Sequence, residues 1–330
     1  MNRLFAPACC LLTAMLTLQT PAETLAERAA ALLEAHPGER VIAGADGWRF
    51  LAAELRHLAL GDRWIAPATP PEPAHMDPLP ALRLLRSQLE ELGIPLLIVP
   101  VPAKGAALPA MLPGGEAPAV PAPPPFLARL TQEGFHVLDL LPLLADAAEA
   151  QTYCRSDTHW TPHGAEIAAA AVAARIRQIA QLPESEPLDI RAAAPAMISV
   201  QGDLAAEGDP AEPLPARAVS RADGGPLIDS ASPILLLGDS HTLVFGDGGD
   251  MHARNSGFTE HLALQLGMPI DRIANRGSAS TPPRLTLFRT AARDETWLTS
   301  KRAVIYLFTE RELTQSLNGW RELPVAPRFR

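Results

Sequence analysis

The chain has 330 residues, of which 47% are hydrophobic, and a formal net charge of −9 at pH 7. This length is enough for one large domain with a sizeable core, and the acidic balance argues against a nucleic acid as partner. An anionic polymer would gain no general attraction either, so binding one would require a local basic groove.

Residues 1–22 have the features of an export signal. Arg3 gives a positive start, an apolar stretch runs from Leu4 to Leu18, and Ala22 ends a short segment suited to cleavage. The apolar stretch is shorter than the ~20 residues that a membrane-spanning helix needs. A cleaved signal peptide is therefore favoured, and an uncleaved signal anchor is the alternative. We expect a signal peptide at 1–22 and a single domain at 23–330, located in the periplasm and either free or anchored to the inner membrane.

Two residue types are scarce after this segment. Cys154 is the only cysteine outside residues 1–22, so no intramolecular disulfide is expected. Lysine occurs only at Lys104 and Lys301, while arginine supplies the other basic side chains. Together with the many alanines and prolines, this points to genome composition rather than to function.

The first half of the domain reads as helices and strands separated by proline-rich loops. Residues 40–51 predict two strands joined by a tight turn at Asp46 and Gly47, and the apolar run at 94–101 is typical of a strand buried on both faces. Helical spacing and the remaining apolar runs predict helices at 25–35, 79–92, 126–133 and 163–180, a strand at 135–140, and irregular loops at 66–80 and 102–125.

Residues 183–231 are poorly patterned and predict an irregular insert of short strands and loops. After it, strands are expected at 234–237, 272–274 and 303–308, with helices at 258–266 and 284–293. Short apolar strands that alternate with helices predict a three-layer α/β/α fold around a parallel sheet. Ligands of such sheets bind beyond the carboxyl ends of the strands, and Ser240, Asn275, Gly277 and Glu310 all follow expected strand ends.

The motif SDTHW carries a carboxylate and an imidazole two residues apart. In an extended segment Asp157 and His159 point to the same side, so Asp157 can accept from one ring nitrogen and leave the other to act as a base. The plain alternative is a structural loop in which Asp157 caps a turn and His159 is packed or solvated.

The motif GDSH supplies a hydroxyl directly after an expected strand. Ser240 at that position can present its Oγ to a cleft, and backbone N–H groups there can stabilise an oxyanion. The alternative is an ordinary Gly-Asp-Ser turn or helix cap. Together with Asp157 and His159, Ser240 would complete a Ser/His/Asp set suited to acyl transfer.

The segment Asn275-Arg276-Gly277 follows another expected strand. A glycine lets the backbone N–H approach a reacting oxygen without interference from a Cβ, although an ordinary turn would have the same sequence. His241 is interpreted as a wall of the cleft rather than a base. No histidine and cysteine spacing typical of a structural metal site occurs, and no phosphate-binding loop is found, so we expect neither metal nor cofactor.

Several segments together resemble a known family. GADGWRFL, LLIVPVPAK, SDTHWTPHGA, LLLGDSH and VIYLFTEREL occur in this order from about residue 41 to 317, and they resemble the alginate O-acetyltransferase (AlgJ/AlgX) family of SGNH-hydrolase-like proteins. The resemblance implies an SGNH-like α/β/α fold with altered chain order, because the aspartate and histidine here precede the serine.

The resemblance also implies roles for residues. Ser240 would be the nucleophile, His159 the base and Asp157 its orienting partner, with Ser240, Gly277 and Asn275 as candidates for the oxyanion hole. Where ordinary SGNH hydrolases carry an asparagine in their third block, this chain has Thr309-Glu310-Arg311. Arg311 could replace that donor, but a structural Glu310–Arg311 pair is favoured.

The candidates for substrate binding are Trp160, His241, Arg276 and Arg311. The implied activity is transfer of an acetyl group onto hydroxyls of an exported polysaccharide, with a membrane-bound O-acyltransferase as the acetyl supplier. Two alternatives stay open: a carbohydrate acetylesterase, and a non-catalytic polysaccharide-binding scaffold of an export complex.

Overall fold

A five-stranded parallel sheet forms the centre of the molecule. The structure is a computed structural model that describes residues 23–61, 76–121, 123–146, 151–183 and 186–329. The expected signal at 1–22 and most of the proline-rich loop at 66–80 lie outside these residues. The strands run in the order β10 (Asp271–Ala274), β9 (Ile234–Gly238), β11 (Ala303–Thr309), β3 (Leu96–Val101) and β4 (His136–Val137).

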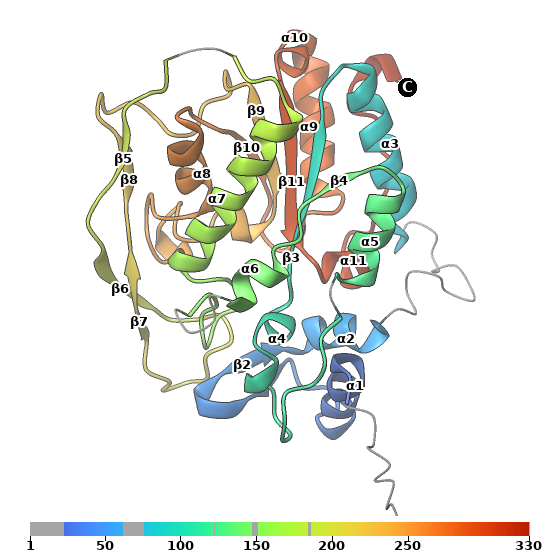
Figure 1. Cartoon of the computed structure of the whole chain (residues 1–330), viewed down its shortest axis with the longest axis vertical. Coiled ribbons are helices and arrows are strands. Elements are labelled where there is room, and N and C mark those ends of the chain that lie inside the picture. Colours follow the sequence, from blue (N-terminus) through green and yellow to red (C-terminus); the bar gives the residue numbers. More distant parts are fainter. Residues whose placement is uncertain (1–22, 62–75, 122, 147–150, 184–185, 330) are drawn as a thin grey trace, which may run out of the picture.

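The sheet is buried on both faces because its strands alternate between two cores. In β3, Leu97, Val99 and Val101 face one core, whereas Leu96 and Ile98 face the other. The first core is covered by α6 (Leu141–Asp146), α7 (Pro162–Ile179) and α8 (Phe258–Leu266); the second by α3 (Pro78–Glu91), α5 (Pro125–Gln132), α9 (Pro282–Arg293), α10 (Glu295–Thr299) and α11 (Glu312–Gln315). Figure 1 shows α7 and α8 on one side of β11 and α3 on the other, which is the expected three-layer α/β/α fold.

A small N-terminal unit covers the end of the sheet at which β3 and β11 finish (Figure 1). It contains α1 (Leu25–Ala35), the antiparallel pair β1 (Val41–Ala43) and β2 (Arg49–Leu51), and α2 (Ala52–Leu60). The N-terminus of α1 is fixed by a capping box between Thr24 and Glu27. The predicted strand, turn and strand over residues 40–51 is confirmed.

Residues 186–231 form two antiparallel pairs beside α7 and α8, as the weak pattern predicts. β5 (Ile190–Ala192) pairs with β8 (Val219–Arg221), and β6 (Ala196–Val200) pairs with β7 (Glu212–Ala216).

The structure corrects two of the predicted elements. The strand expected at 135–140 shortens to β4, because Asp139 accepts from the N–H of Leu141 and turns the chain into α6. The loop at 102–125 contains the short helix α4 (Lys104–Ala107) and the 3₁₀ turn η4 (Pro109–Met111), which are too short to show a periodic pattern. None of the helices in the described residues is long and apolar enough to span a membrane.

Candidate active site

The SDTHW motif lies at the tip of a tight hairpin. Tyr153 and Trp160 form an antiparallel bridge, Cys154 N–H donates to the carbonyl of His159 at 3.1 Å, and the hairpin leads directly into α7. Thr161 caps that helix by accepting from the N–H of Gly164, and a proline fills the first helical position. The hairpin therefore presents Asp157 and His159 on a segment fixed at both ends.

The serine is held by the strand that precedes it. Ser240 begins the 3₁₀ turn η6 (Ser240–Thr242) just after β9. Asp239 is fully buried and accepts from the N–H groups of His241 (2.9 Å) and Thr309 (2.7 Å), which ties the ends of β9 and β11 together. Burial works to raise the pKa of Asp239, but His241 and these N–H groups work the other way, and the pKa falls to about 2.

The hairpin and the serine meet in one continuous relay. His159 Nε2 lies 2.8 Å from Ser240 Oγ, and His159 Nδ1 lies 2.5 Å from Asp157 Oδ1. Asp157 and His159 are buried, whereas Ser240 is half-buried. The structure thus brings together the three residues that the sequence predicts, although 81 positions separate His159 from Ser240. Such a relay can move the hydroxyl proton to Nε2 and prepare the oxygen for attack.

Four donors surround the carboxylate of Asp157. Its Oδ1 accepts from the backbone N–H and the ring of His159, and its Oδ2 accepts from the N–H of Asp203 (3.2 Å) and from His252 Nε2 (3.0 Å). Burial alone would raise the pKa of Asp157, but the hydrogen bonds from His159 and His252 lower it below its ordinary value. The carboxylate is therefore ionised and fixed in place.

Sequence reasoning missed both Asp203 and His252. His252 follows a glycine-rich stretch, and its spacing relates it to no other motif. Asp203 belongs to the predicted irregular insert, which gave no reason to expect contact with the site.

The insert packs tightly against the hairpin tip. Asp203 accepts from Thr158 N–H at 2.7 Å, and the N–H of Leu204 donates to the carbonyl of Ser156. A Cβ placed on Gly202 would lie 1.9 Å from that same carbonyl oxygen, so only glycine fits there. The insert is a brace for the hairpin rather than an independent appendage.

A buried lysine supports the hairpin from the other side. Lys104 Nζ donates to the carbonyl oxygens of Asp157 (2.5 Å) and Arg49 (2.9 Å), and it lies 5.8 Å from the ring centroids of both Trp48 and Phe50. Two family-like segments, GADGWRFL and LLIVPVPAK, thus converge behind the aspartate.

The turn after β10 lies beside the serine strand. The N–H of Asn275 donates to the carbonyl of Gly238 at 3.1 Å, and Gly277 adopts a φ of 79° that favours glycine. Within the described part of the chain, the N–H groups of Ser240 and Gly277 donate to no acceptor, and the Oδ1 atom of Asn275 is buried without a partner. The two N–H groups are therefore available as donors to a ligand, whereas the buried Oδ1 of Asn275 is an acceptor and cannot donate to an oxyanion.

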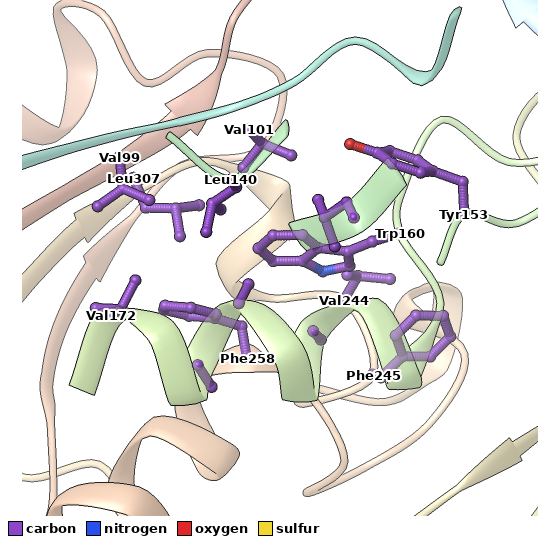
Figure 2. Close-up of a cluster of buried hydrophobic side chains, with 14 of the residues drawn as sticks. Val99, Val101, Leu140, Tyr153, Trp160, Val172, Val244, Phe245, Phe258 and Leu307 are labelled. Atoms are coloured by element: carbon purple, nitrogen blue, oxygen red, sulfur yellow. The ribbon is translucent and has the colours of Figure 1, made fainter. Parts of the chain in front are cut away.

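Two of the predicted substrate-binding residues are buried instead. Trp160 is 0% exposed and stacks on Phe258 with ring centroids 5.6 Å apart; Figure 2 shows it inside the apolar cluster, near Leu140 and Val244. His241 is 1% exposed, and its ring packs against those of His159 and Trp160. Neither side chain is accessible to a polysaccharide, and both support the relay by packing.

The two predicted arginines have acidic partners. Arg276 is exposed and forms a two-point pair with Asp250, one contact of which measures 3.0 Å. Arg311 pairs with Glu54 at 2.7 Å. The prediction of a structural pair between Arg311 and Glu310 is therefore wrong. Glu310 lies 3.9 Å from the ring of His57 instead.

No three His, Cys, Asp or Glu side chains among the described residues are grouped as a metal site requires. Cys154 is buried as a free thiol, and burial raises its pKa, so it offers no thiolate for nucleophilic chemistry.

Comparisons with known proteins identify the family of the chain. Residues 41–305 match the family described as the SGNH hydrolase-like domain of the acetyltransferase AlgX. The chain is 29% identical over 290 residues to the probable alginate O-acetylase AlgJ of Pseudomonas syringae pv. tomato, an alignment that covers 85% of this chain and 70% of the relative.

Solved structures show the same fold. The O-acetyltransferase domain of Pseudomonas putida AlgJ aligns with a TM-score of 0.62 and 25% identity, covering 83% of this chain and 92% of that domain. Pseudomonas aeruginosa AlgX aligns with a TM-score of 0.55 and 20% identity, covering 85% of this chain and 65% of AlgX.

Proposed function

Because the chain belongs to the family of SGNH hydrolase-like domains of the acetyltransferase AlgX, we propose that it is an O-acetyltransferase that works through Ser240. The observation that carries this proposal is the unbroken relay from Asp157 through His159 to the Ser240 hydroxyl, with both hydrogen bonds at 2.5–2.8 Å.

In the first half-reaction the enzyme takes an acetyl group from an ester donor. His159 Nε2 accepts the proton of Ser240 Oγ while that oxygen attacks the acetyl carbonyl carbon. The oxyanion that forms accepts from the free N–H groups of Ser240 and Gly277. When the intermediate collapses, the bond to the donor oxygen breaks, His159 returns the proton to that oxygen, and the acetyl group stays on Ser240.

In the second half-reaction a sugar hydroxyl replaces the donor. His159 accepts the proton of that hydroxyl as its oxygen attacks the acetyl-serine, and the same two N–H groups hold the new oxyanion. Collapse transfers the acetyl group and returns the proton to Ser240 Oγ. The ionised Asp157 stabilises the imidazolium in both steps.

The acceptor we propose is an exported polysaccharide of the alginate type. The relative from Pseudomonas syringae is named a probable alginate O-acetylase, and one from Pseudomonas aeruginosa an alginate biosynthesis protein. We further propose that residues 1–22 direct export to the periplasm, and that a membrane-bound O-acyltransferase supplies the acetyl group there.

The decisive experiment follows the acetyl group by mass spectrometry. The full chain, given an acetyl-ester donor and a panel of oligosaccharides, should yield acetylated oligosaccharide and gain one acetyl group on Ser240. Ser240→Ala should abolish both products, whereas Ser87→Ala, on an exposed face of α3, should abolish neither. Release of free acetate with every acceptor would favour an esterase, and full transfer by Ser240→Ala would refute the proposal.

A further inference from the structure

His252 occupies an unfavourable backbone conformation. Its φ of 69° and ψ of −65°, together with the 2.9 Å hydrogen bond from Ala253 N–H to the carbonyl of Met251, define a three-residue γ-turn with positive φ. This turn is rare and strained for residues other than glycine.

The strained turn directs the imidazole to Asp157. His252 Nε2 lies 3.0 Å from Asp157 Oδ2, and the side chain is only 11% exposed. The ring also packs against Phe245, which has a positive φ of its own (62°). Backbone strain persists where the surrounding structure over-determines it, and such sites cluster at functional groups.

We propose that His252 is a positioning residue for the relay, which holds Asp157 through Oδ2 while His159 uses Oδ1. The inference rests on the proposed roles of Asp157 and His159. A donor on Oδ2 keeps the carboxylate from rotating away from the His159 ring, and it draws part of the negative charge away from that ring. His252 therefore affects both the orientation of the base and the pH range in which the base is neutral.

Charged and titratable groups surround both His252 and the His159 ring that it influences. His252 faces Asp157 across the hairpin and has Asp250 two residues before it, which pairs with Arg276. Asp157 also bonds the ring of His159 and, through its carbonyl oxygen, the Lys104 ammonium. The ring of His241 packs on that of His159 with centroids 4.8 Å apart.

The test uses two variants with opposite properties. His252→Gly removes the donor but relieves the turn, because glycine adopts positive φ without steric cost, so its thermal midpoint should stay close to that of the wild type. Its kcat for acetyl-ester turnover should fall about tenfold at unchanged KM. The acid-side midpoint of its pH profile should rise by about half a unit, because more of the Asp157 charge then favours protonated His159.

His252→Gln places an amide donor near the position of Nε2 and should recover most of the wild-type profile. The control is His261→Gln, another buried histidine, which lies 3.5 Å from Glu166 and does not touch Asp157; it should leave the midpoint unchanged.

A second readout does not depend on turnover. Nitrogen-15 NMR of labelled histidines follows the protonation of His159 directly, and its midpoint should rise in His252→Gly as the activity midpoint does. An unchanged NMR midpoint, whatever happens to kcat, would overturn the inference. Failure of the proposed function would be distinct, because it would show as turnover that survives Ser240→Ala.

Discussion

The two lysines of the chain lie at opposite ends of the sheet, and their surroundings differ. Lys301, before β11, donates to the carbonyls of Ser230 and Ser232 and pairs with the Asp271 carboxylate at 2.7 Å. Lys104, after β3, is equally buried but forms no ion pair with any carboxylate of the described residues.

The difference shows two uses of the same side chain. Burial lowers the pKa of Lys104, because it removes water from the ammonium group. Lys301 offsets the same loss of water with the negative charge of Asp271. Lys104 has main-chain oxygens and aromatic faces instead, and one of those oxygens belongs to Asp157. The sequence attributes the scarcity of lysine to genome composition. The two lysines nevertheless lie one at each end of the sheet, and of the two only Lys104 contacts the relay.

Replacing each lysine by methionine should give the largest effects, and only the Lys104 variant should lose activity as well as stability. Lys104→Met leaves buried carbonyls without a donor and should lower the free energy of unfolding by about 3 kcal/mol. It should also reduce kcat about a hundredfold in protein that is still folded, because the hairpin tip loses its support. Urea unfolding and acetyl-ester turnover at low temperature measure the two effects.

Lys301→Met is the matched control. It leaves Asp271 buried with Trp297 Nε1 as its remaining side-chain partner, so it should destabilise the fold by a similar amount, yet leave kcat of the folded fraction unchanged. Equal losses of kcat in both variants would contradict the comparison.

Gly202→Ala tests the opposite side of the same hairpin. Its Cβ would overlap the carbonyl oxygen of Ser156, so the insert or the hairpin must move, at a cost of about 2 kcal/mol in stability. Because Asp203 then loses its contact with Asp157, we expect kcat to fall by roughly tenfold to a hundredfold. Wild-type turnover would mean that the insert does not brace the relay.

Asp239→Asn extends the comparison of buried charges to a carboxylate, at the end of the sheet where Ser240 lies. Because the pKa of Asp239 falls from 3.8 to about 2 on folding, its ionised form stabilises the native state above about pH 4, and this contribution is lost as the pH falls toward 2. The variant should be less stable than wild type by about 2 kcal/mol at neutral pH. Urea midpoints should converge between pH 4 and pH 2, and a constant difference over that range would contradict the assignment.

Gly277→Ala should have the smallest effect. An added Cβ meets no neighbour, but the φ of 79° disfavours alanine by about 1 kcal/mol. The turn should shift slightly and kcat should fall about tenfold as the N–H donor is displaced, with little change in thermal midpoint. Gly277→Asn, which tolerates positive φ better, should lose less; unchanged kcat in the alanine variant would remove Gly277 from the oxyanion hole.

The sequence predicted most of the fold because its signals were strong and local. The continuous apolar run of β3 and the alanine-rich face of α7 each identify their element without tertiary information. The four-residue helix α4 is too short to show a periodic pattern, and the early end of β4 depends on the turn in which Asp139 accepts from the N–H of Leu141. The sequence therefore predicts no helix at α4 and too long a strand at β4.

The candidate site divides in the same way. Asp157, His159 and Ser240 were predicted from short motifs, since their chemistry dictates their residue types. Trp160 is a candidate for substrate binding from its sequence, but an indole suits a core equally well, and its stacking on Phe258 of α8 places it in the core. His252 contacts Asp157 across 95 positions, a relation that local sequence does not carry.

The place of β11 in the sheet has a consequence for folding. β9 leads to Ser240 and β3 leads to Lys104, but these strands are joined only through β11, which follows both of them in the chain. Until β11 is in place, the sheet consists of two separate halves, β10–β9 and β3–β4, and pairing between such distant segments is slow. The segments that follow β9 and β3 are therefore fixed side by side only when residues 303–309 pair with both halves.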